Sequence, residues 1–212
     1  MASVLMTTRD ALHAVAEYVL AGPQYEQSGT IRLRVSDGGI ATVAAPFVRL
    51  DGVELAEEHG SRLAVTARTC TELAAEFGLT ARRLRDVYAD GPRLGPDDRL
   101  TLDPDAAHQI VAAFGSGASA FALLAPDVVA VLWPEHFDLS ITLDEANYGV
   151  AAPDDYLAEP YAYVGPLRSQ TGAFWNAPFG SARAMSSLGS AAALLDYFRQ
   201  AQAEVARAAS YS

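Results

Sequence analysis

Strand-length segments in which apolar and polar residues alternate occur in two separate parts of this chain. In the first, Ile31-Arg32-Leu33-Arg34-Val35 alternates strictly and precedes the turn signal Asp37-Gly38-Gly39. In the second, residues 137–143 read Phe-Asp-Leu-Ser-Ile-Thr-Leu. Alternation with period two places one side of a strand in the core and the other in water, and short Asp-Gly turns join antiparallel neighbours. The pattern predicts antiparallel strands in two blocks.

The first block is predicted to be a meander. Further strands are expected over residues 40–43, 48–50, 53–55 and 63–66, with Asp51-Gly52 as a second hairpin turn. In the second block, the apolar run 128–133 predicts a central strand covered on both faces. Residues 159–164 form another candidate strand, and 165–187 are predicted to be irregular.

Helical periodicity predicts helices before, between and after these blocks. The first runs from about Arg9 to Ala21, with Thr8 as its cap and Gly22-Pro23 as its stop. The middle ones follow the capping-box spacing Thr69-Cys70-Thr71-Glu72, span residues 80–88, and run from Asp103-Pro104 past Phe114. There Gly115-Ser116-Gly117 either ends the helix or allows close packing against another element. The last helix covers about 191–208.

These elements indicate a single α+β domain over residues 1–212. Residues 1–125 would hold the meander and helices, and residues 126–212 the second strand block and the terminal helix. The N- and C-terminal helices are expected to pack on the sheet.

Composition excludes several classes of function. All 15 basic residues are arginine, so the chain has no lysine for a Schiff base, a P-loop or a kinase site. The formal net charge of -11 argues against nucleic acid or an anionic membrane as a partner. The apolar stretch 118–133 is interrupted by Pro126-Asp127, too early for a membrane span. We expect a soluble, cytoplasmic protein.

The single cysteine, Cys70, precludes an internal disulfide and a multi-cysteine zinc site. It falls in the first turn of a predicted helix, where it is either a reactive thiol or a small buried hydrophobic residue. His13, His59 and His108 are predicted to be surface or half-buried side chains.

The densest chemistry lies between Trp133 and Trp175. If the strand begins as early as His136, then His136, Asp138 and Ser140 share one of its faces. Asp138 could then orient His136 and raise its basicity, as in a general base or a metal ligand with its supporting carboxylate. The alternative is a hydrogen-bonded structural pair or a solvated face.

Neighbouring residues supply the walls of a candidate pocket. Aromatic and amide side chains are predicted to bind a small-molecule ligand: Trp133, Asn147, Tyr148, Tyr161, Tyr163, Trp175 and Asn176. Glu159 would add a second carboxylate to the catalytic candidates His136 and Asp138. These three residues have ligand types acceptable to zinc, iron or manganese, although their spacing matches no recognised metal motif, so the cofactor is left unknown. The aromatic residues could equally be core.

Several short motifs resemble an uncharacterised, largely actinobacterial family that is known as a domain of unknown function. The resemblance is carried by W-P-x-H-F-D-L (133–139), N-Y-G (147–149), E-P-Y-x-Y-V (159–164), F-W (174–175) and L-L-D-Y-F-R (194–199). It is clearest from Val131 onward. It implies a shared fold and a shared site around His136, Asp138 and Glu159, and it implies no reaction.

Two hypotheses follow for function. In the first, the protein binds or transforms a small molecule in an aromatic-lined pocket between the second strand block and the terminal helix. His136 would then transfer a proton in a hydrolytic or isomerising reaction. In the second, the protein is a non-catalytic structural or interaction module whose polar cluster stabilises the fold. A homodimer through the terminal helix is compatible with both.

Overall fold

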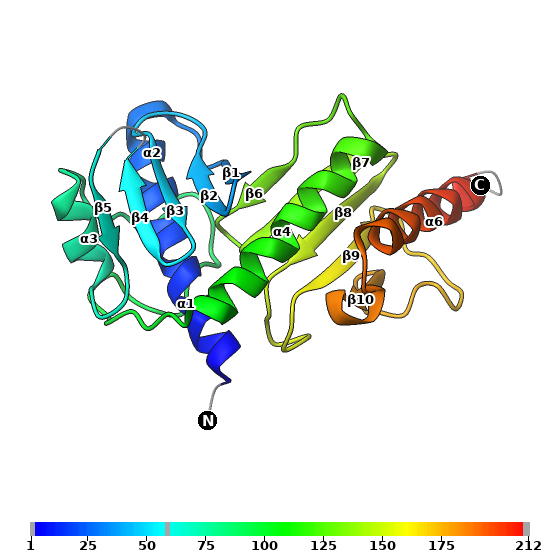
Figure 1. The fold of residues 1–212 in the computed structure, drawn as a ribbon. Coiled ribbons are helices and arrows are strands. Elements are labelled where there is room, and N and C mark those ends of the chain that lie inside the picture. The colour runs from blue at the N-terminus through cyan, green and yellow to red at the C-terminus, as the bar shows by residue number, and fades with distance from the viewer. Residues whose placement is uncertain (1–2, 58–59, 210–212) are drawn as a thin grey trace. The chain divides into compact units, whose positions relative to one another are not determined.

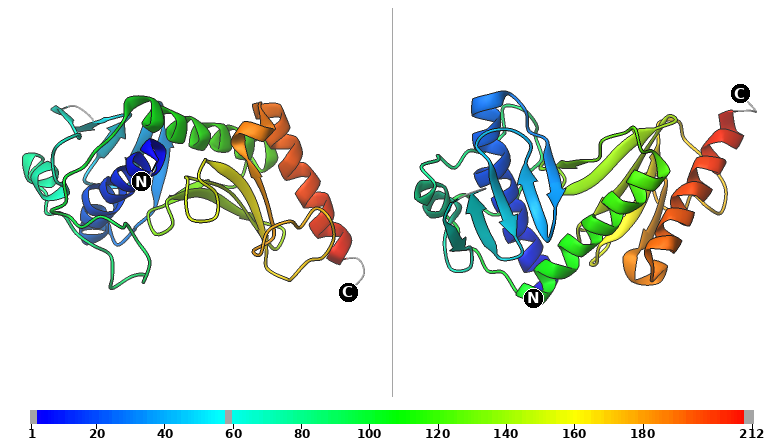
Figure 2. Two further views of the ribbon diagram at one scale, coloured as in Figure 1. Left: turned by 90° about the horizontal axis from the view of Figure 1, so that it is seen from below. Right: turned by 45° about the horizontal axis from the view of Figure 1, so that its top comes forward.

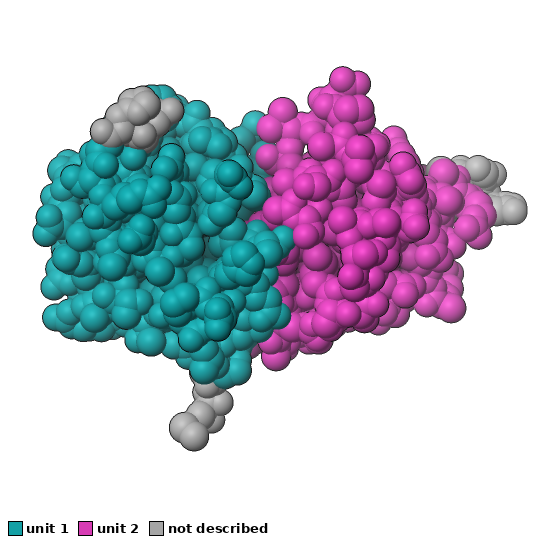
Figure 3. Space-filling view, in the orientation of Figure 1, with its two compact units in different colours: residues 1–112, 131–137 teal, residues 113–130, 138–212 magenta. Residues whose placement is uncertain are grey.

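The computed structural model describes residues 3–57 and 60–209 and has an α+β fold, which confirms the predicted class. Along the chain, antiparallel strands come before and after a helical middle, and helices begin and end the fold (Figure 1). The chain divides into two compact units, unit 1 within residues 1–112 and 131–137, and unit 2 within 113–130 and 138–212 (Figure 3). The division at residues 112 and 113 falls within a helix.

The helices and strands of unit 1 follow the predicted order closely. They are α1 (Val4–Val15), the π-helix η1 (Ala16–Ala21), α2 (Gly22–Ser28), β1 (Leu33–Ser36), β2 (Gly39–Thr42), β3 (Val48–Asp51), β4 (Glu54–Glu57), β5 (Arg62–Ala64), α3 (Cys70–Glu76) and β6 (Val131–Trp133). The strands lie in the order β6-β1-β2-β3-β4-β5. The capping box of Thr69 and Glu72 begins α3 as predicted.

The first helix is longer than predicted, because Gly22-Pro23 does not stop it. Ser3 caps α1, and helical structure continues through η1 and α2 to Ser28. Pro23 has no N–H to give to the carbonyl of Tyr18, one π-turn earlier. The N–H of Arg82 donates to that carbonyl instead, at 3.0 Å. Gly22 permits this approach, since a Cβ there would collide with the Arg82 carbonyl.

The predicted helix over residues 80–88 is absent, and this segment is irregular. Its N–H groups bond partly to the first helix and partly within the segment, where those of Val87 and Tyr88 donate to the Leu84 carbonyl. Besides the Arg82 N–H, the N–H of Leu84 donates to the Glu17 carboxylate at 3.2 Å. Leu84 is buried, so the segment packs as a fixed covering on the helix. Residues 79–103 as a whole contain no helix or strand.

Unit 2 is a helix-covered antiparallel sheet with strand order β10-β9-β8-β7. Its elements are the later part of α4 (Pro104–Leu124), β7 (Asp138–Leu143), β8 (Ala146–Ala151), β9 (Tyr161–Pro166), β10 (Ser181–Ala184), α5 (Met185–Leu188) and α6 (Ala191–Ala209). Both α4 and α6 pack on one face of the sheet (Figure 2). β10 and α5 lie in the stretch that the sequence predicts to be irregular.

The glycine cluster in α4 is a close-packing site rather than a helix end. The helix runs unbroken past Gly117, where a Cβ would lie 2.8 Å from Val150 and 3.3 Å from Leu139. Among the described residues, α4 is the one helix long and apolar enough to cross a membrane by length and composition. Ala107, Ile110 and Phe114 are buried at helical spacing, as in the core helix of a soluble protein, with which the fold is compatible.

The predicted strand over residues 128–133 is shorter and more exposed than expected. Only Val131–Trp133 is strand, and it pairs with β1 through Leu132 and Leu33. Leu132 is fully buried, whereas Val129 is 84% exposed. The apolar run is therefore partly a surface connection, because Pro126 and Asp127 place its first residues in a turn.

Candidate functional site

His136 lies in a tight turn and not on a strand. The N–H of Phe137 donates to the Trp133 carbonyl at 2.9 Å, and Phe137 has a φ of +57°. β7 begins only at Asp138, so His136 is not part of the strand. The predicted strand alternation therefore does not place His136 on the same face as Asp138. The turn is held in place by His13, which stacks on Phe137 at 5.3 Å between ring centroids.

The imidazole of His136 is 61% exposed and faces two carboxylates that the sequence analysis did not select. Its Nδ1 is 4.0 Å from Asp90, and its Nε2 is 3.9 Å from Glu135. One ligand atom from each of these three residues lies within 4.8 Å of the other two. The group has the donor types of a divalent-cation site, one imidazole and two carboxylates. The sequence does not predict this arrangement, because Asp90 lies in the irregular segment 79–103, which is distant from His136 along the chain.

Asp138 is buried and bound to Tyr163 on the sheet face that α4 and α6 leave uncovered. The register places Ser140 opposite Gly149, and Gly149 opposite Tyr163. The Tyr163 ring lies over Gly149, where a Cβ would collide with it, and its hydroxyl donates to the Asp138 carboxylate. Burial raises the pKa of Tyr163, and the neighbouring charge of Asp138 raises that pKa further. Asp138 and Ser140 therefore share one strand face as predicted, without His136, and the register brings Tyr163 to the same face.

Tyr161 extends this polar and aromatic face. Its hydroxyl donates to Asp154 at 2.7 Å, and the same carboxylate accepts the N–H of Tyr156 at 2.8 Å. Burial raises the pKa of Tyr161, with the Asp154 carboxylate as the next cause. Glu159, in the connection between β8 and β9, is half-buried and makes no ion pair within the described part of the chain. Both tyrosines thus have carboxylate partners, but neither partner is Glu159.

Three of the predicted ligand-binding residues instead make contacts within the protein. Tyr148 is fully buried on the helix-covered face, edge-on to Phe198 at 6.0 Å, and burial raises its pKa to about 12. Asn176 uses both ends of its amide on the backbone of Ala182, at 2.9 and 3.1 Å. Asn147 is exposed and accepts from Thr142 at 2.7 Å. Tyr148 thus packs against α6 and Asn176 ties its loop to β10, which leaves both residues unavailable to a ligand.

Trp133 and Trp175 have different surroundings. Trp133 is half-buried in β6, with the guanidinium of Arg32 over its ring at 5.9 Å. Trp175 lines a pocket of about 380 Å³ in unit 2. We call it the α6 pocket, and its lining residues are Thr171, Gly172, Ala173, Phe174, Trp175, Arg183, Gln200 and Glu204. The pocket lies between the loop before β10, β10 itself and α6.

A buried polar row on the first helix was not anticipated. Arg9, His13 and Glu17 recur every fourth residue, and all three are buried. Glu17 accepts hydrogen bonds from the hydroxyl of Tyr88 at 2.8 Å and from the N–H of Leu84. Burial raises the pKa of Glu17, and these hydrogen bonds partly oppose that shift. The four-residue spacing was visible in the sequence, but the partners come from irregular chain.

His13 is a core side chain, which corrects its prediction as a surface or half-buried residue. Its Nε2 donates to the carbonyl of Pro134 at 2.6 Å, which fixes the neutral tautomer with a bare Nδ1. Burial, aided by the nearby charge of Arg9, lowers the pKa of His13 to about 3. His108 is exposed as predicted, and His59 lies outside the described residues.

Cys70 is the small buried residue rather than the reactive thiol of the two interpretations. Its side chain is fully buried and free of any disulfide. Burial raises the pKa of this thiol to about 12, and the charge of Asp97 contributes, so the thiolate is disfavoured despite the helix N-terminus.

Comparison of the chain with protein-family models, with curated proteins and with solved structures gives no match in any of the three.

Proposed function

We propose that the protein binds a small planar or aromatic molecule that carries hydrogen-bond acceptors, and that it does so in the α6 pocket. The observation that carries this proposal is the combination of an aromatic wall with unpaired polar groups around one cavity. A volume of about 380 Å³ is within the range of ligand sites, which is roughly 300–1,000 Å³.

The aromatic wall is held by contacts outside the cavity. Phe174 stacks on Tyr197 of α6 at 5.7 Å, and Trp175 meets Phe174 edge-on at 5.0 Å. Asn176, anchored on Ala182, follows directly in the chain and fixes the end of the loop. A wall that is already ordered loses little conformational entropy when a flat ligand stacks against it, which favours binding.

Three polar groups of the α6 pocket are available to a ligand, whereas the Glu204 carboxylate in its lining is paired with Arg207 at 2.9 Å. Within the described chain, the guanidinium of Arg183, the amide of Gln200 and the indole N–H of Trp175 have no hydrogen-bond partner. The Arg183 guanidinium instead lies over the Tyr197 ring at 5.5 Å. All three groups donate hydrogen bonds, so they favour a ligand with acceptors such as a carboxylate.

Proton transfer by His136 and Asp138 is not needed for this function and stays a separate hypothesis. The hydrogen bond between Tyr163 and Asp138 favours the alternative role for Asp138, in which the polar cluster stabilises the fold. The exposed His136, beside Asp90 and Glu135, is better suited to binding a cation than to a closed catalytic site.

Fluorescence of a single tryptophan tests the proposed function. In a Trp133→Phe variant, Trp175 is the sole tryptophan, and benzoate and nicotinate would be titrated as planar carboxylates, with excitation at the red edge of tryptophan absorption and absorbance-corrected controls. We expect a saturable change, and affinity on the order of tenfold weaker after Arg183→Gln, from the loss of one charge-assisted hydrogen bond. Arg199→Gln, also in unit 2 but outside the α6 pocket, is the matched control and should bind as tightly as its parent.

Two results would overturn the proposal. One is a linear, unsaturated response of Trp175 to both compounds. The other is equal loss of affinity in the Arg183 and Arg199 variants, which would attribute binding to overall charge.

A further inference from the structure

A second polar surface lies in unit 1, on the face of its sheet turned away from the first helix (α1, η1 and α2). Cross-strand register aligns five residues in one row, in the order Arg34, Ala41, Arg49, Ala56 and Arg62. Arginine and alanine alternate, so each long side chain stands beside a short one. The alternate positions, such as Ile40 and Leu50, point to the other face and are buried.

The charges on this face do not balance. Two carboxylates, Asp51 and Glu54, lie in the adjacent row of the same face. Arg62 binds both of them, each at 3.1 Å, and Arg49 binds Asp51 through Nε at 2.8 Å. Arg34 is exposed and has no hydrogen bond or ion pair to any residue that the structure describes. Three guanidinium groups against two carboxylates leave one positive charge, in a protein whose formal net charge is -11.

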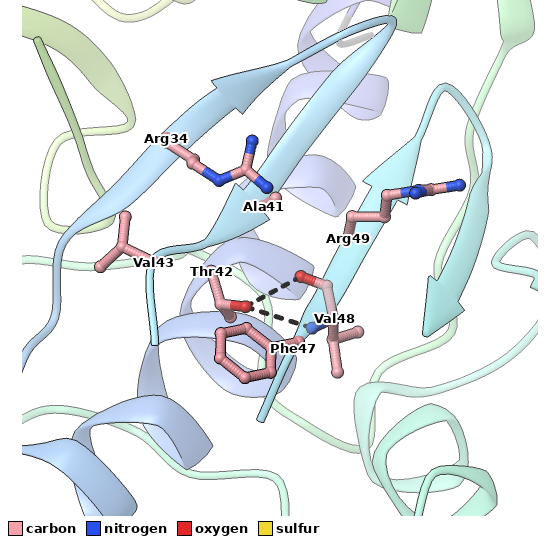
Figure 4. A pocket seen from close by; sticks show the side chains of 7 residues that line it. All are labelled: Arg34, Ala41, Thr42, Val43, Phe47, Val48 and Arg49. Atoms are coloured by element: carbon pink, nitrogen blue, oxygen red, sulfur yellow. Dashed lines mark hydrogen bonds between the residues drawn. The ribbon is translucent and has the colours of Figure 1, made fainter. Parts of the chain in front are cut away.

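The unpaired Arg34 borders a pocket of about 320 Å³, which we call the arginine pocket. Figure 4 shows Arg34 and Arg49 on the strands either side of Ala41, and Phe47 beside Thr42. Ala41 is buried between the two arginines, so its small methyl group lines the bottom of the pocket and leaves the space between the arginines open. The terminal nitrogens of Arg49 have no partner within the described chain, since Asp51 takes only Nε.

The other end of the arginine pocket is apolar and open to solvent. Phe47 is 57% exposed and Val43 is 45% exposed, and both line the pocket. The hydroxyl of Thr42 is already bound to the backbone of Val48 and Pro46, so it holds this loop rather than a ligand. An unpaired cation and exposed apolar groups thus meet in one cavity.

We infer that the arginine pocket binds a small amphipathic anion, with its phosphate or carboxylate head between Arg34 and Arg49 and its apolar body against Phe47 and Val43. The guanidinium supplies paired N–H donors to an oxyanion, which an isolated surface charge does not. Phe47 and Val43 lose exposed apolar area when the ligand body covers them, which adds a hydrophobic contribution. This site is separate from the α6 pocket, and neither inference depends on the other.

Amide chemical shifts of the ¹⁵N-labelled full chain test the inference. Phenyl phosphate, phenylacetate, inorganic phosphate and benzyl alcohol would be titrated separately. We expect saturable shifts at the amides of residues 34, 41–43 and 47–49 with the first two compounds, and affinity on the order of tenfold weaker for the last two. Preference between phenyl phosphate and phenylacetate identifies the head group. Added salt should weaken binding by screening.

Two variants and one control decide the outcome. Arg34→Gln should weaken phenyl phosphate binding on the order of tenfold, and Phe47→Ala should bring its affinity toward that of inorganic phosphate. Both residues are exposed, so these variants should fold, and Arg199→Gln controls for net charge. Unchanged affinity in Arg34→Gln, equal affinity for benzyl alcohol, or shifts absent from these amides would each overturn the inference.

Discussion

The two units differ in where their polar side chains meet the rest of the chain. In unit 1, the buried charged and polar residues lie mainly on the first helix (α1, η1 and α2), which carries Arg9, His13, Glu17 and Gln24. In unit 2, α4 and α6 cover the sheet with apolar contacts such as Phe121 on Phe198. Its polar groups lie on the sheet face opposite α4 and α6 and at the rim of the α6 pocket.

This difference indicates what each set of polar groups does. The first helix of unit 1 supplies bonding partners to chain that has no regular structure, such as the N–H of Leu84 and the carbonyl of Pro134. Gln24 does the same for four backbone groups of residues 30–44. In unit 2 the Arg183 and Gln200 side chains lack such partners, so we assign stability to the first set and binding to the second.

The largest effect is expected from removing the carboxylate that organises the irregular segment. Glu17→Ala leaves the Tyr88 hydroxyl and the Leu84 N–H buried without a partner, which should cost about 3 kcal/mol of unfolding free energy. Urea unfolding measures it. Glu26→Ala, on the exposed side of the same helix, should change little. Equal effects of the two substitutions would refute the assigned role of the buried row.

Acidification should destabilise the protein through His13. Its folded-state pKa of about 3 lies below the unfolded value of 6.5, so the unfolded chain binds the proton first and stability falls as the pH drops below 6.5. Between pH 6.5 and 5 this single group should cost about 2 kcal/mol. The raised pKa of Glu17 acts in the opposite direction, because the folded state binds that proton first.

A His13→Gln variant separates these contributions, since it keeps Glu17 and a donor for the Pro134 carbonyl. Its unfolding free energy should depend less on pH than that of the wild type over the same window. Parallel pH profiles for the two proteins would mean that His13 does not remain neutral in the folded state.

Two glycines of unit 2 differ in the space around them: Gly149 faces the Tyr163 ring, and Gly115 faces open space. Gly149→Ala must displace the Tyr163 ring and its hydrogen bond to Asp138, at a cost of about 2 kcal/mol. Gly115→Ala, in α4, meets no atom within 4 Å and should stabilise by about 0.5–1 kcal/mol. Thermal unfolding with near-ultraviolet circular dichroism would record both changes. A stabilising Gly149→Ala would show that Tyr163 adjusts freely.

The smallest effect is expected at the exposed imidazole. His136→Ala should change the unfolding free energy by no more than about 0.5 kcal/mol in EDTA, since the side chain is 61% exposed. A loss of several kcal/mol would assign His136 a structural role. Added zinc should raise the melting temperature of the wild type and not of the variant if Asp90, Glu135 and His136 bind the ion.

Local sequence signals predicted most elements of the fold. The Asp37-Gly38-Gly39 and Asp51-Gly52 turns, the capping box at Thr69 and the terminal helix all depend on neighbouring residues. The wrong predictions occur where a hydrogen bond from a distant part of the chain determines the local structure. Pro23 is tolerated in the helix because Arg82 replaces its missing donor, and the predicted helix over residues 80–88 is absent because the N–H groups of Arg82 and Leu84 bond to the first helix.

The candidate site was predictable to the extent that it follows strand alternation. Period two predicted that Asp138 and Ser140 share one strand face, whereas the register that brings Tyr163 to Asp138 over Gly149 was not predicted. His136 was misplaced because the left-handed φ of Phe137 ends the alternation. The α6 pocket could be foreseen through Trp175 alone, since Arg183 and Gln200 join it from elements whose placement depends on the tertiary fold.

The π-helical segment Ala16–Ala21 also determines the direction in which the later side chains of the first helix point around its axis. A π-turn holds one residue more than an α-turn, so Gln24 is turned by about 100° relative to an uninterrupted α-helix of the same sequence. That rotation points its amide at the backbone of residues 30–44. The length of this stretch is therefore as constrained as its composition, and losing one alanine here would misdirect a residue several positions away.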